Sequence, residues 1–215
     1  MQITSIKPTR SSNTMILVFN DGSILPFPPD GFVKMGIKKY FELSSDLLNQ
    51  IYQKSVEHQL WEYSLRQLAI HSQPEKIISQ KLKNFSRKIF LSGNIKSTSI
   101  DTSGIIVDII SRLKNQKLID NSNFAIGFAQ KSHNKSKRQI IMELNQKGID
   151  RPDQNLAVLS LDDKEKIKNY LDKKRYTHKN FSDRNEKNKI MAALYRRGFS
   201  LSDIKSVIDD LLNNR

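Results

Sequence analysis

One pattern recurs along the chain: an amphipathic helix with a leucine near its basic C-terminal end, followed by residues that end the helix. The leucines are Leu82, Leu144 and Leu194, which lie 62 and 50 residues apart. In the second and third copies, Gly148 and Gly198 follow at the position where a left-handed residue ends a helix. Self-similarity at such a period indicates stacked helical units that bury one another's faces. We therefore expect a mainly α fold of tandem three-helix repeats, elongated and curved, with a small N-terminal antiparallel β segment.

The clearest copy is the stretch from residue 118 to residue 149. Asp120 or Asn121 can cap its first helix by accepting hydrogen bonds from the free amides of the first turn. Two apolar stripes at helical spacing follow, one on each side of a basic joint, and such stripes usually face a core. Their residues are Phe124, Ala125, Phe128 and Ala129, then Ile140, Ile141 and Leu144.

The N-terminal segment has a different character. The run 15–19 favours a strand, and Asn20-Asp21-Gly22 is a strong hairpin signal before a return strand at 23–27. The 3–7 segment can add a third strand. Prolines at 26, 28 and 29 end the return strand because they cannot donate to a ladder.

Helices are expected from residue 44 onward, where Ser44 or Ser45 can act as the cap. Later helix starts are predicted at Pro74, at Asp101–Ser103, and at Ser200 with Asp203 in a capping box. The stretch 86–100 is expected to be a long polar connection, and 176–182 a polar link. These features divide the chain into an extension at 1–57 and three helical repeats at 58–120, 121–161 and 162–215.

The net charge of the chain limits the classes of partner that we expect. The chain has 36 Lys+Arg against 22 Asp+Glu, a formal net charge of +14, and only +1 of it lies within residues 1–57. Such an excess favours a polyanionic partner, most often nucleic acid, although a solvated basic surface is the alternative. No cysteine is present, which excludes disulfides and thiolate sites. Neither a signal peptide nor a membrane span is recognisable, so a soluble cytoplasmic protein is expected.

Three groups of basic residues are candidates for contact with DNA or a partner. The first group lies in and beside the loop that joins the two central helices, which we call the basic joint. Cations near the N-terminus of the second of these helices are unfavourable because of its dipole, and a bound phosphate or acidic partner would offset this unfavourable energy. The second interleaves with Tyr176 and His178, whose rings could stack on bases. The third precedes a helix C-terminus, a place that the dipole alone would explain. The residues are Lys131, Lys135, Lys137, Arg138 and Lys147; Lys173, Lys174, Arg175 and Lys179; and Arg196 and Arg197.

Enzymatic function finds little support in the residues. The four histidines lack ligand-like spacing, so a zinc site is not expected. Gly22, Gly31 and Gly36 form no phosphate-binding loop after a strand, and no cofactor is expected. The pairs Asp162-Asp163 and Asp209-Asp210 point to different helix sides, which suits solvent better than acid–base catalysis. A metal-dependent nuclease, with carboxylates brought together from distant positions in the sequence, is an alternative that the sequence does not exclude. The sequence identifies no residues for such a site.

The order of motifs resembles the RecX family, bacterial modulators of the RecA recombinase. The resemblance covers about residues 58–213 and is most specific in the 118–149 block. The residues that carry it are Tyr63, Leu65, Leu68-Ala69, Glu75 and Lys81-Leu82; Leu118-Ile119-Asp120, Phe124-Ala125, Phe128, Arg138-Gln139-Ile140, Glu143-Leu144 and Lys147-Gly148-Ile149; and Arg196-Arg197-Gly198-Phe199-Ser200, Ile204 and Val207-Ile208.

The resemblance implies three tandem three-helix repeats, no catalysis, and binding of a monomer in the groove of the RecA–single-stranded DNA filament. Restraint of filament growth, ATPase and strand exchange would follow, with a role in DNA repair, recombination and the SOS response. The first repeat departs from the family pattern, because Ile70, His71, Ser72 and Pro74 replace its usual basic residues and Ile77 an expected acid. From another class, a stand-alone helical nucleic-acid-binding module without a recombinase partner is the alternative.

Overall fold

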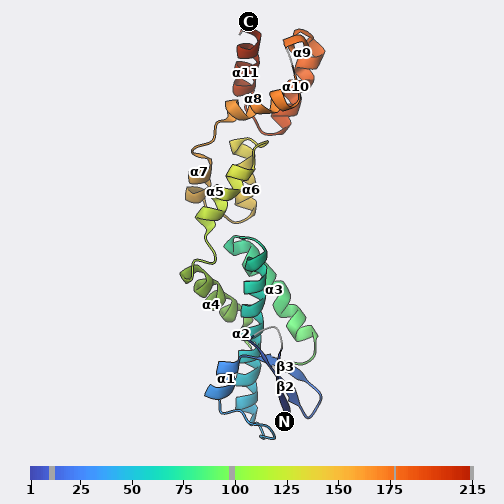
Figure 1. Cartoon of the computed structure of the whole chain (residues 1–215), viewed down its shortest axis with the longest axis vertical. Coiled ribbons are helices and arrows are strands. Elements are labelled where there is room, and N and C mark those ends of the chain that lie inside the picture. The colour runs from blue at the N-terminus through green and yellow to red at the C-terminus, as the bar shows by residue number, and fades with distance from the viewer. Residues whose placement is uncertain (10–12, 97–99, 177, 214–215) are drawn as a thin grey trace. The chain divides into compact units, whose positions relative to one another are not determined.

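A computed structural model of the chain describes residues 1–9, 13–96, 100–176 and 178–213, without the side chains of His178 and Lys179. The chain divides into two compact units, Met1–Ile119 and Asp120–Arg215. Figure 1 labels most elements of both units. No helix in the described part of the chain is both long enough and apolar enough to cross a membrane.

The N-terminal residues of the first unit form the predicted sheet. β1 (Ile3–Pro8), β2 (Met15–Phe19) and β3 (Ile24–Phe27) are antiparallel and lie in the order β1-β2-β3. The turn between β2 and β3 is the predicted one, and Gly22 takes its left-handed conformation with φ +82°. Pro26 lies in β3, which is an edge strand, where proline is tolerated.

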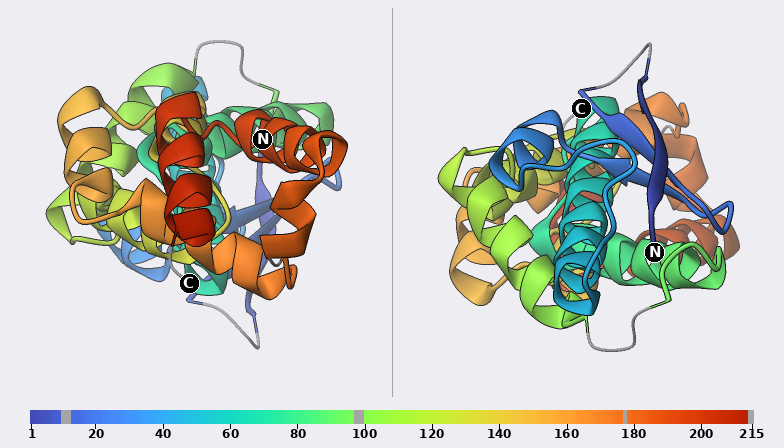
Figure 2. Two further views of the ribbon diagram at one scale, coloured as in Figure 1. Left: turned by 90° about the horizontal axis from the view of Figure 1, so that it is seen from above. Right: turned by 90° about the horizontal axis from the view of Figure 1, so that it is seen from below.

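A short helix, α1 (Pro29–Lys34), follows the sheet and was not predicted. Its proline occupies the first helical turn, where a missing amide costs little. α2 (Ser45–Ile70) begins at the predicted cap, since the Ser44 hydroxyl accepts from the Leu47 amide at 3.2 Å. Figures 1 and 2 show the strands lying beside this long helix.

Two further helices complete the first unit. α3 (Glu75–Leu91) begins after Pro74, and α4 (Thr102–Asn115) begins after Asp101, whose carboxylate accepts from two first-turn amides. The prediction of an irregular connection over 86–100 was wrong for its first part. Residues 86–91 continue α3 because Ser86 and Ile89 are buried against the core, so packing stabilises a stretch whose polar residues suggested a break.

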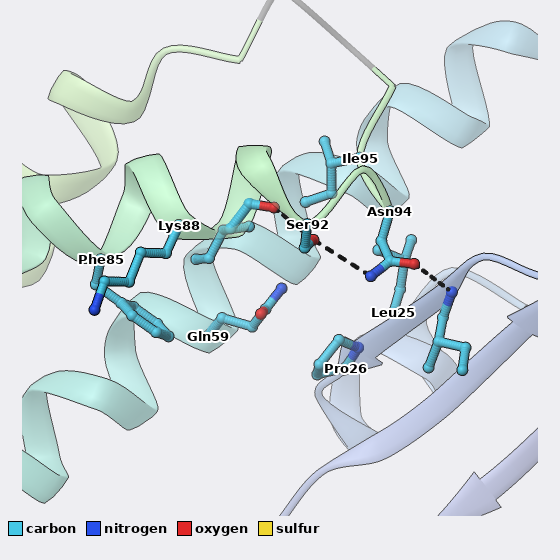
Figure 3. Close-up of a pocket in the computed structure, with 10 residues that line it drawn as sticks. Leu25, Pro26, Gln59, Phe85, Lys88, Ser92, Asn94 and Ile95 are labelled. Atoms are coloured by element: carbon cyan, nitrogen blue, oxygen red, sulfur yellow. Dashed lines mark hydrogen bonds between the residues drawn. The ribbon is translucent and has the colours of Figure 1, made fainter.

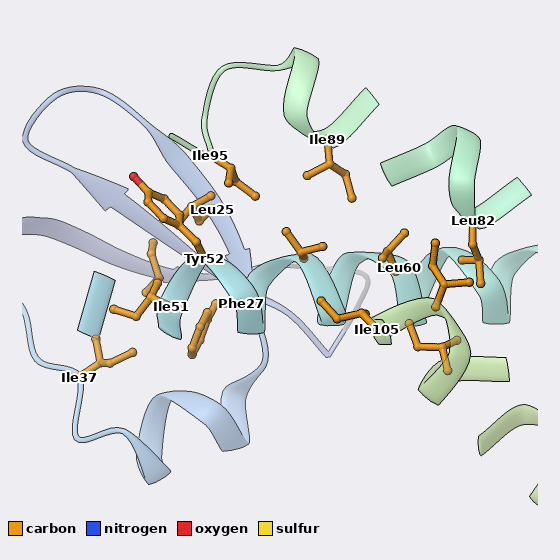
Figure 4. Packing of buried hydrophobic residues seen from close by; sticks show 14 of the residues in the cluster. Leu25, Phe27, Ile37, Ile51, Tyr52, Leu60, Leu82, Ile89, Ile95 and Ile105 are labelled. Atoms are coloured by element: carbon orange, nitrogen blue, oxygen red, sulfur yellow. The ribbon is translucent and has the colours of Figure 1, made fainter. Parts of the chain in front are cut away.

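One hydrophobic core serves the sheet and all three long helices of this unit. It runs from Leu25 and Phe27 of β3 through Ile51 and Leu60 of α2 to Leu82 and its neighbours, as Figure 4 shows. The boundary predicted between residues 57 and 58 falls inside α2, which passes through it without a break. The extension and the first repeat therefore share a helix and a core.

The second unit begins with a three-helix bundle. α5 (Asn121–Lys131) is capped by Asp120, which accepts from the Asn123 amide at 2.8 Å. α6 (Lys137–Gln146) and α7 (Arg151–Val158) follow. Its core consists of Ala125, Ala129, Ile140, Leu144, Ile149, Ala157 and Val158, which include residues of both predicted stripes. We call this bundle the second repeat.

A second bundle, the third repeat, ends the chain. It contains α8 (Asp163–Lys173), α9 (His178–Ser182), α10 (Arg184–Arg196) and α11 (Leu201–Asn213). The predicted polar link at 176–182 is in part the short helix α9, because Phe181 is buried in this core and anchors it. Ser200 caps α11 as predicted: its hydroxyl accepts from the Asp203 amide and donates to the Asp203 carboxylate. A mainly helical fold with a small antiparallel sheet is confirmed.

Candidate nucleic-acid interface

The predicted basic joint is the loop between α5 and α6. Ser132 caps the end of α5, and the Ser136 hydroxyl caps α6 by accepting from the Gln139 amide at 3.1 Å. Lys131 and Arg138 flank this loop with exposed side chains, and no carboxylate in the described part of the chain lies in an ion pair with either. Both cations are therefore available to a partner.

Two other predicted cations are held within the second repeat. The Lys135 ammonium lies 2.6 Å from a Glu143 carboxylate oxygen and 5.5 Å from the centre of the Phe128 ring. The Lys147 ammonium lies 5.4 Å from the same ring. A cation over an aromatic face is stabilised by the negative charge of that face. Phe128 thus positions both ammonium groups at the surface of the second repeat.

Lys137 contributes its backbone to the joint. Its amide donates to both carboxylate oxygens of Asp163, at 2.9 and 3.2 Å. The acid expected at this helix N-terminus is therefore supplied by the third repeat itself. The prediction that Asp163 faces solvent was wrong: this side chain is half-buried, and burial raises the pKa of its carboxyl group. Its neighbour Asp162 caps α8 by accepting from the Lys164 amide.

Lys166, which the sequence did not single out, fastens the third repeat to the same loop. Its side chain is buried, and its ammonium donates to the carbonyl oxygens of Ser132 at 3.3 Å and Lys135 at 3.1 Å. Burial lowers the pKa of this ammonium group because the charged form loses solvation. A charge buried in this way needs fixed acceptors, and the two carbonyl groups provide them.

Arg197 closes the joint from the other side. Its guanidinium carbon lies 4.6 Å from the centre of the Tyr170 ring, and one guanidinium nitrogen donates to the Asn134 carbonyl at 3.5 Å. The next residue, Gly198, has φ +83°, and a Cβ there would lie 2.6 Å from the Ser136 hydroxyl oxygen. Two features therefore favour glycine at this position: the left-handed backbone conformation and the close approach of the Ser136 hydroxyl group.

The end of α8 carries the second predicted group. Lys173, Lys174 and Arg175 are exposed, and Arg175 takes a left-handed conformation with φ +56° as the chain leaves the helix. The Tyr176 ring, predicted to stack on bases, packs instead against the core of the third repeat. The side chains of His178 and Lys179 lie outside the described residues.

Residues of the second and third predicted groups meet at one cavity. It has a volume of about 300 Å³ and is lined by Asn134, Tyr170, Lys173, Lys174 and Arg197. We call it the joint cavity, because its walls come from the α5–α6 loop, from α8 and from the end of α10. The other exposed cations of the predicted groups, among the described side chains, do not line it; they are Lys131, Arg138, Arg175 and Arg196.

A ring with a partner recurs at the same place in each repeat. The partner is the third residue after the recurring leucine, and the ring comes from the first helix of the bundle. In the first repeat Tyr63 stacks on Phe85 at 4.2 Å between ring centres. The corresponding pairs are Phe128 with Lys147, and Tyr170 with Arg197. The pairs support the likeness of the three bundles, and a cation occupies the partner position in the second and third.

One of the four histidines has a structural role. His58 is buried, and its Nε2 lies 2.8 Å from the Thr14 hydroxyl oxygen. No cluster of three or more His, Asp or Glu side chains suited to a metal ion occurs among the described residues.

A larger cavity, of about 430 Å³, lies between β3 and α3 and is shown in Figure 3. Ile, Leu, Pro and Phe side chains form much of its lining, and Lys88 is its one charged residue. Asn94 at its rim receives a hydrogen bond from the Ile24 amide and donates one to the Ser92 hydroxyl. Its walls do not bring acid and base groups together.

Helical bundles that recur along the chain, with cations gathered where the second and third repeats join, define a class of modular helical-repeat proteins. Residues 162–208 match the family model described as the third three-helix domain of RecX. A curated relative, regulatory protein RecX of Oceanobacillus iheyensis, is 24% identical over 185 residues, which are 83% of this chain and 63% of that protein. The chain therefore spans less than two thirds of the length of this relative.

Two solved structures share the fold. One, a crystal structure of regulatory protein RecX, has a TM-score of 0.67 and 21% identity, over 97% of this chain and 98% of that chain. The other, RecX from Lactobacillus salivarius, has a TM-score of 0.59 and 24% identity, over 73% and 96%. Together with the matched third domain and the curated relative, they agree with the resemblance to the RecX family that was noted in the sequence.

Proposed function

We propose that this chain, which resembles RecX proteins, is a non-enzymatic regulator that binds, as a cytoplasmic monomer, in the groove of the RecA–single-stranded DNA filament. Binding there would restrain filament growth, ATP hydrolysis and strand exchange. The identity of the partner, RecA, comes from the resemblance to the RecX family. The observation that carries the proposal is a set of exposed cations in the second and third repeats that form no ion pair with a carboxylate among the residues that the structure describes. These are Lys131, Arg138, Lys173, Lys174, Arg175 and Arg196.

Such cations suit both components of a nucleoprotein filament. Phosphates of the DNA and acidic surfaces of the recombinase attract them, and the release of counterions makes the binding depend on salt. The intramolecular pair of Lys135 with Glu143 makes that lysine a weaker contributor than its exposed neighbours.

The test is a titration of the full chain into RecA assembled on single-stranded DNA at low salt, with ATP hydrolysis as the readout. We expect hydrolysis to fall as the protein is added. The variant Lys131→Ala/Arg138→Ala should need a several-fold higher concentration for the same effect, because it loses two phosphate contacts. Lys189→Ala/Lys205→Ala removes the same charge from other exposed sites of the third repeat and is the matched control. Unchanged hydrolysis at a large excess of protein contradicts the proposal.

The stand-alone nucleic-acid-binding module is the competing function, because the same cations would serve bare DNA or RNA. The two functions differ in one measurable ratio. A filament regulator binds the RecA–DNA filament more tightly than it binds the same DNA alone. Equal affinities, measured at one salt concentration, would favour the module without a recombinase partner.

A further inference from the structure

The joint cavity has the charge of an anion site. Three of its five lining residues are cations, Lys173, Lys174 and Arg197, and no carboxylate lines it. None of the three is in an ion pair with a carboxylate of the described residues, whereas Lys135 and Lys187 elsewhere in the unit are. Cations that surround one cavity repel each other, and a bound anion removes that repulsion.

Helix ends do not supply enough negative charge to balance these cations. α8 ends at Lys173 and α10 at Arg196, so two helix C-termini are close to the cavity. Each contributes about −0.5 of an elementary charge, roughly −1 in total, and a net charge of about +2 remains around the cavity. A phosphodiester carries one negative charge, shared by two non-bridging acceptor oxygens, and therefore offsets about half of this excess.

The Arg197 guanidinium is held in place before any ligand arrives. Tyr170 lies under the Arg197 guanidinium, and the Asn134 carbonyl accepts from one of its nitrogens. A planar guanidinium carries five N–H donors, so several stay available to a phosphate. The buried Lys166 ties the loop that carries Asn134 to α8, and therefore the opposite walls of the cavity are linked.

The neighbouring cavity shows that this charge is local. It has a volume of about 390 Å³ and shares Asn134 and Lys173 with the joint cavity, but Asp162 and Glu165 also line it. Carboxylates repel a phosphate, so an anion is directed to the joint cavity.

We propose that the joint cavity binds a phosphodiester group of a nucleic-acid backbone, held by the Arg197 guanidinium and the ammonium groups of Lys173 and Lys174. From the proposed function this takes only that the partner contains nucleic acid. The junction of the second and third repeats, rather than either bundle alone, is then the place where the strand is gripped.

The test measures binding of the full chain to a fluorescein-labelled oligothymidylate by fluorescence anisotropy at several salt concentrations. Lys173→Ala/Lys174→Ala should weaken binding about tenfold or more at low salt and reduce the slope of log affinity against log salt by about 1.4, since each contact with a single strand contributes about 0.7. Both lysines are exposed, so the variant should keep the fold. Lys189→Ala/Lys205→Ala is the control of equal charge and should change affinity much less.

Two results would overturn this assignment. One is a loss of affinity no larger in the cavity variant than in the control. The other is equal competition by an oligothymidylate with an uncharged methylphosphonate backbone. Neither result depends on RecA, so the two proposals fail separately. Loss of DNA binding in the cavity variant with no effect of the wild-type chain on RecA refutes only the filament function.

Discussion

Lys166 and Lys168 lie two residues apart on α8 in opposite environments. Lys168 is exposed, whereas Lys166 is buried and donates to the carbonyl oxygens of Ser132 and Lys135. The stem of Lys166 packs among the side chains of the joint while its ammonium satisfies backbone groups of the second repeat. Lys166 thus attaches the third repeat to the α5–α6 loop, whereas the ammonium group of Lys168 is exposed to solvent.

We predict that Lys166→Ala lowers the free energy of unfolding of the second unit by about 1–3 kcal/mol, because two carbonyl groups lose a charged donor. Lys168→Ala, which removes the same charge from an exposed site, should change it by less than about 0.5 kcal/mol. Denaturant unfolding of the full chain measures both. Hydrogen exchange should quicken at residues 132–138 in the first variant only, and equal exchange there would show that Lys166 does not fasten the loop.

The carboxyl group of Asp163 makes stability depend on pH in an unusual direction. Burial raises its pKa above 3.8 in the folded state, so between 3.8 and the raised value the folded chain binds more protons than the unfolded chain. In that window the contribution of this group to stability falls as the pH rises.

Asp163→Asn removes this dependence. The free energy of unfolding of the wild type minus that of the variant should therefore be smaller at pH 7 than at pH 4, as measured by denaturant unfolding at both pH values. Other titrating groups are common to the two chains and cancel in the difference. A difference that grows as the pH rises would mean that the pKa of Asp163 is lowered on folding.

These residues also show what the sequence could and could not predict of the site. Charge and spacing predicted the basic groups around Lys131 and Lys173. The burial of Lys166 was missed because lysine is normally exposed. One signal was present: Lys166 stands beside Ile167 and four residues before Tyr170, on the inward stripe of α8. The acceptors for its charge come from a loop that precedes it by about thirty residues, and only the tertiary structure brings them together.

At the level of elements, several helices end with a residue in the left-handed conformation. Gly93 after α3 and Gly198 after α10 both have positive φ, at +74° and +83°. They differ in their surroundings. A Cβ on Gly93 would meet nothing within 4 Å, whereas one on Gly198 would meet the Ser136 hydroxyl of the preceding repeat. One glycine serves only its own helix, and the other also serves the contact between repeats.

We predict that Gly93→Ala lowers the free energy of unfolding by about 1–2 kcal/mol, the cost of a left-handed alanine. Gly198→Ala should cost clearly more, because Ser136 caps α6 and must also move. Denaturant unfolding of the two variants compares them directly. Equal losses would indicate that the contact between the repeats yields without cost.

The elements that the sequence predicted correctly are those with local signals. Ser44, Asp101, Asp120 and Ser200 cap helices where expected, because an N-cap depends on residues within one turn. Residues 86–91 and α9 were missed because their helical state depends on burial of Ile89 and Phe181 in cores assembled from distant segments. The 86–100 stretch contains enough serine, glycine and asparagine to suggest a loop throughout.

On the scale of the whole molecule, the chain consists of two compact units that meet at residues 119 and 120. The first unit contains the sheet and a helical bundle on one core, and the second contains two bundles. The repeat pattern in the sequence predicted the bundles. It did not predict that the β segment and the first bundle share a core.

We predict that fragments 1–119 and 120–215 each fold when expressed alone, because each contains whole helices and its own core. When the chain is cut between residues 57 and 58, the first unit should fold in neither fragment because the cut divides α2 in its middle, whereas residues 120–215 of the longer fragment should still fold. Circular dichroism and cooperative denaturant unfolding distinguish these outcomes. A cooperatively folded 58–215 fragment with a native-like first bundle would contradict this division of the chain.

α2 has a mechanical consequence. Its 26 residues make a rod about 39 Å long that carries the sheet along one part of its length and the helices of the first bundle along the rest. An α-helix resists bending over such a distance, so a molecule that grips the strands would turn the bundle with them. A force applied to the N-terminal strands is thus transmitted through α2 to the first helical bundle, and the two move together.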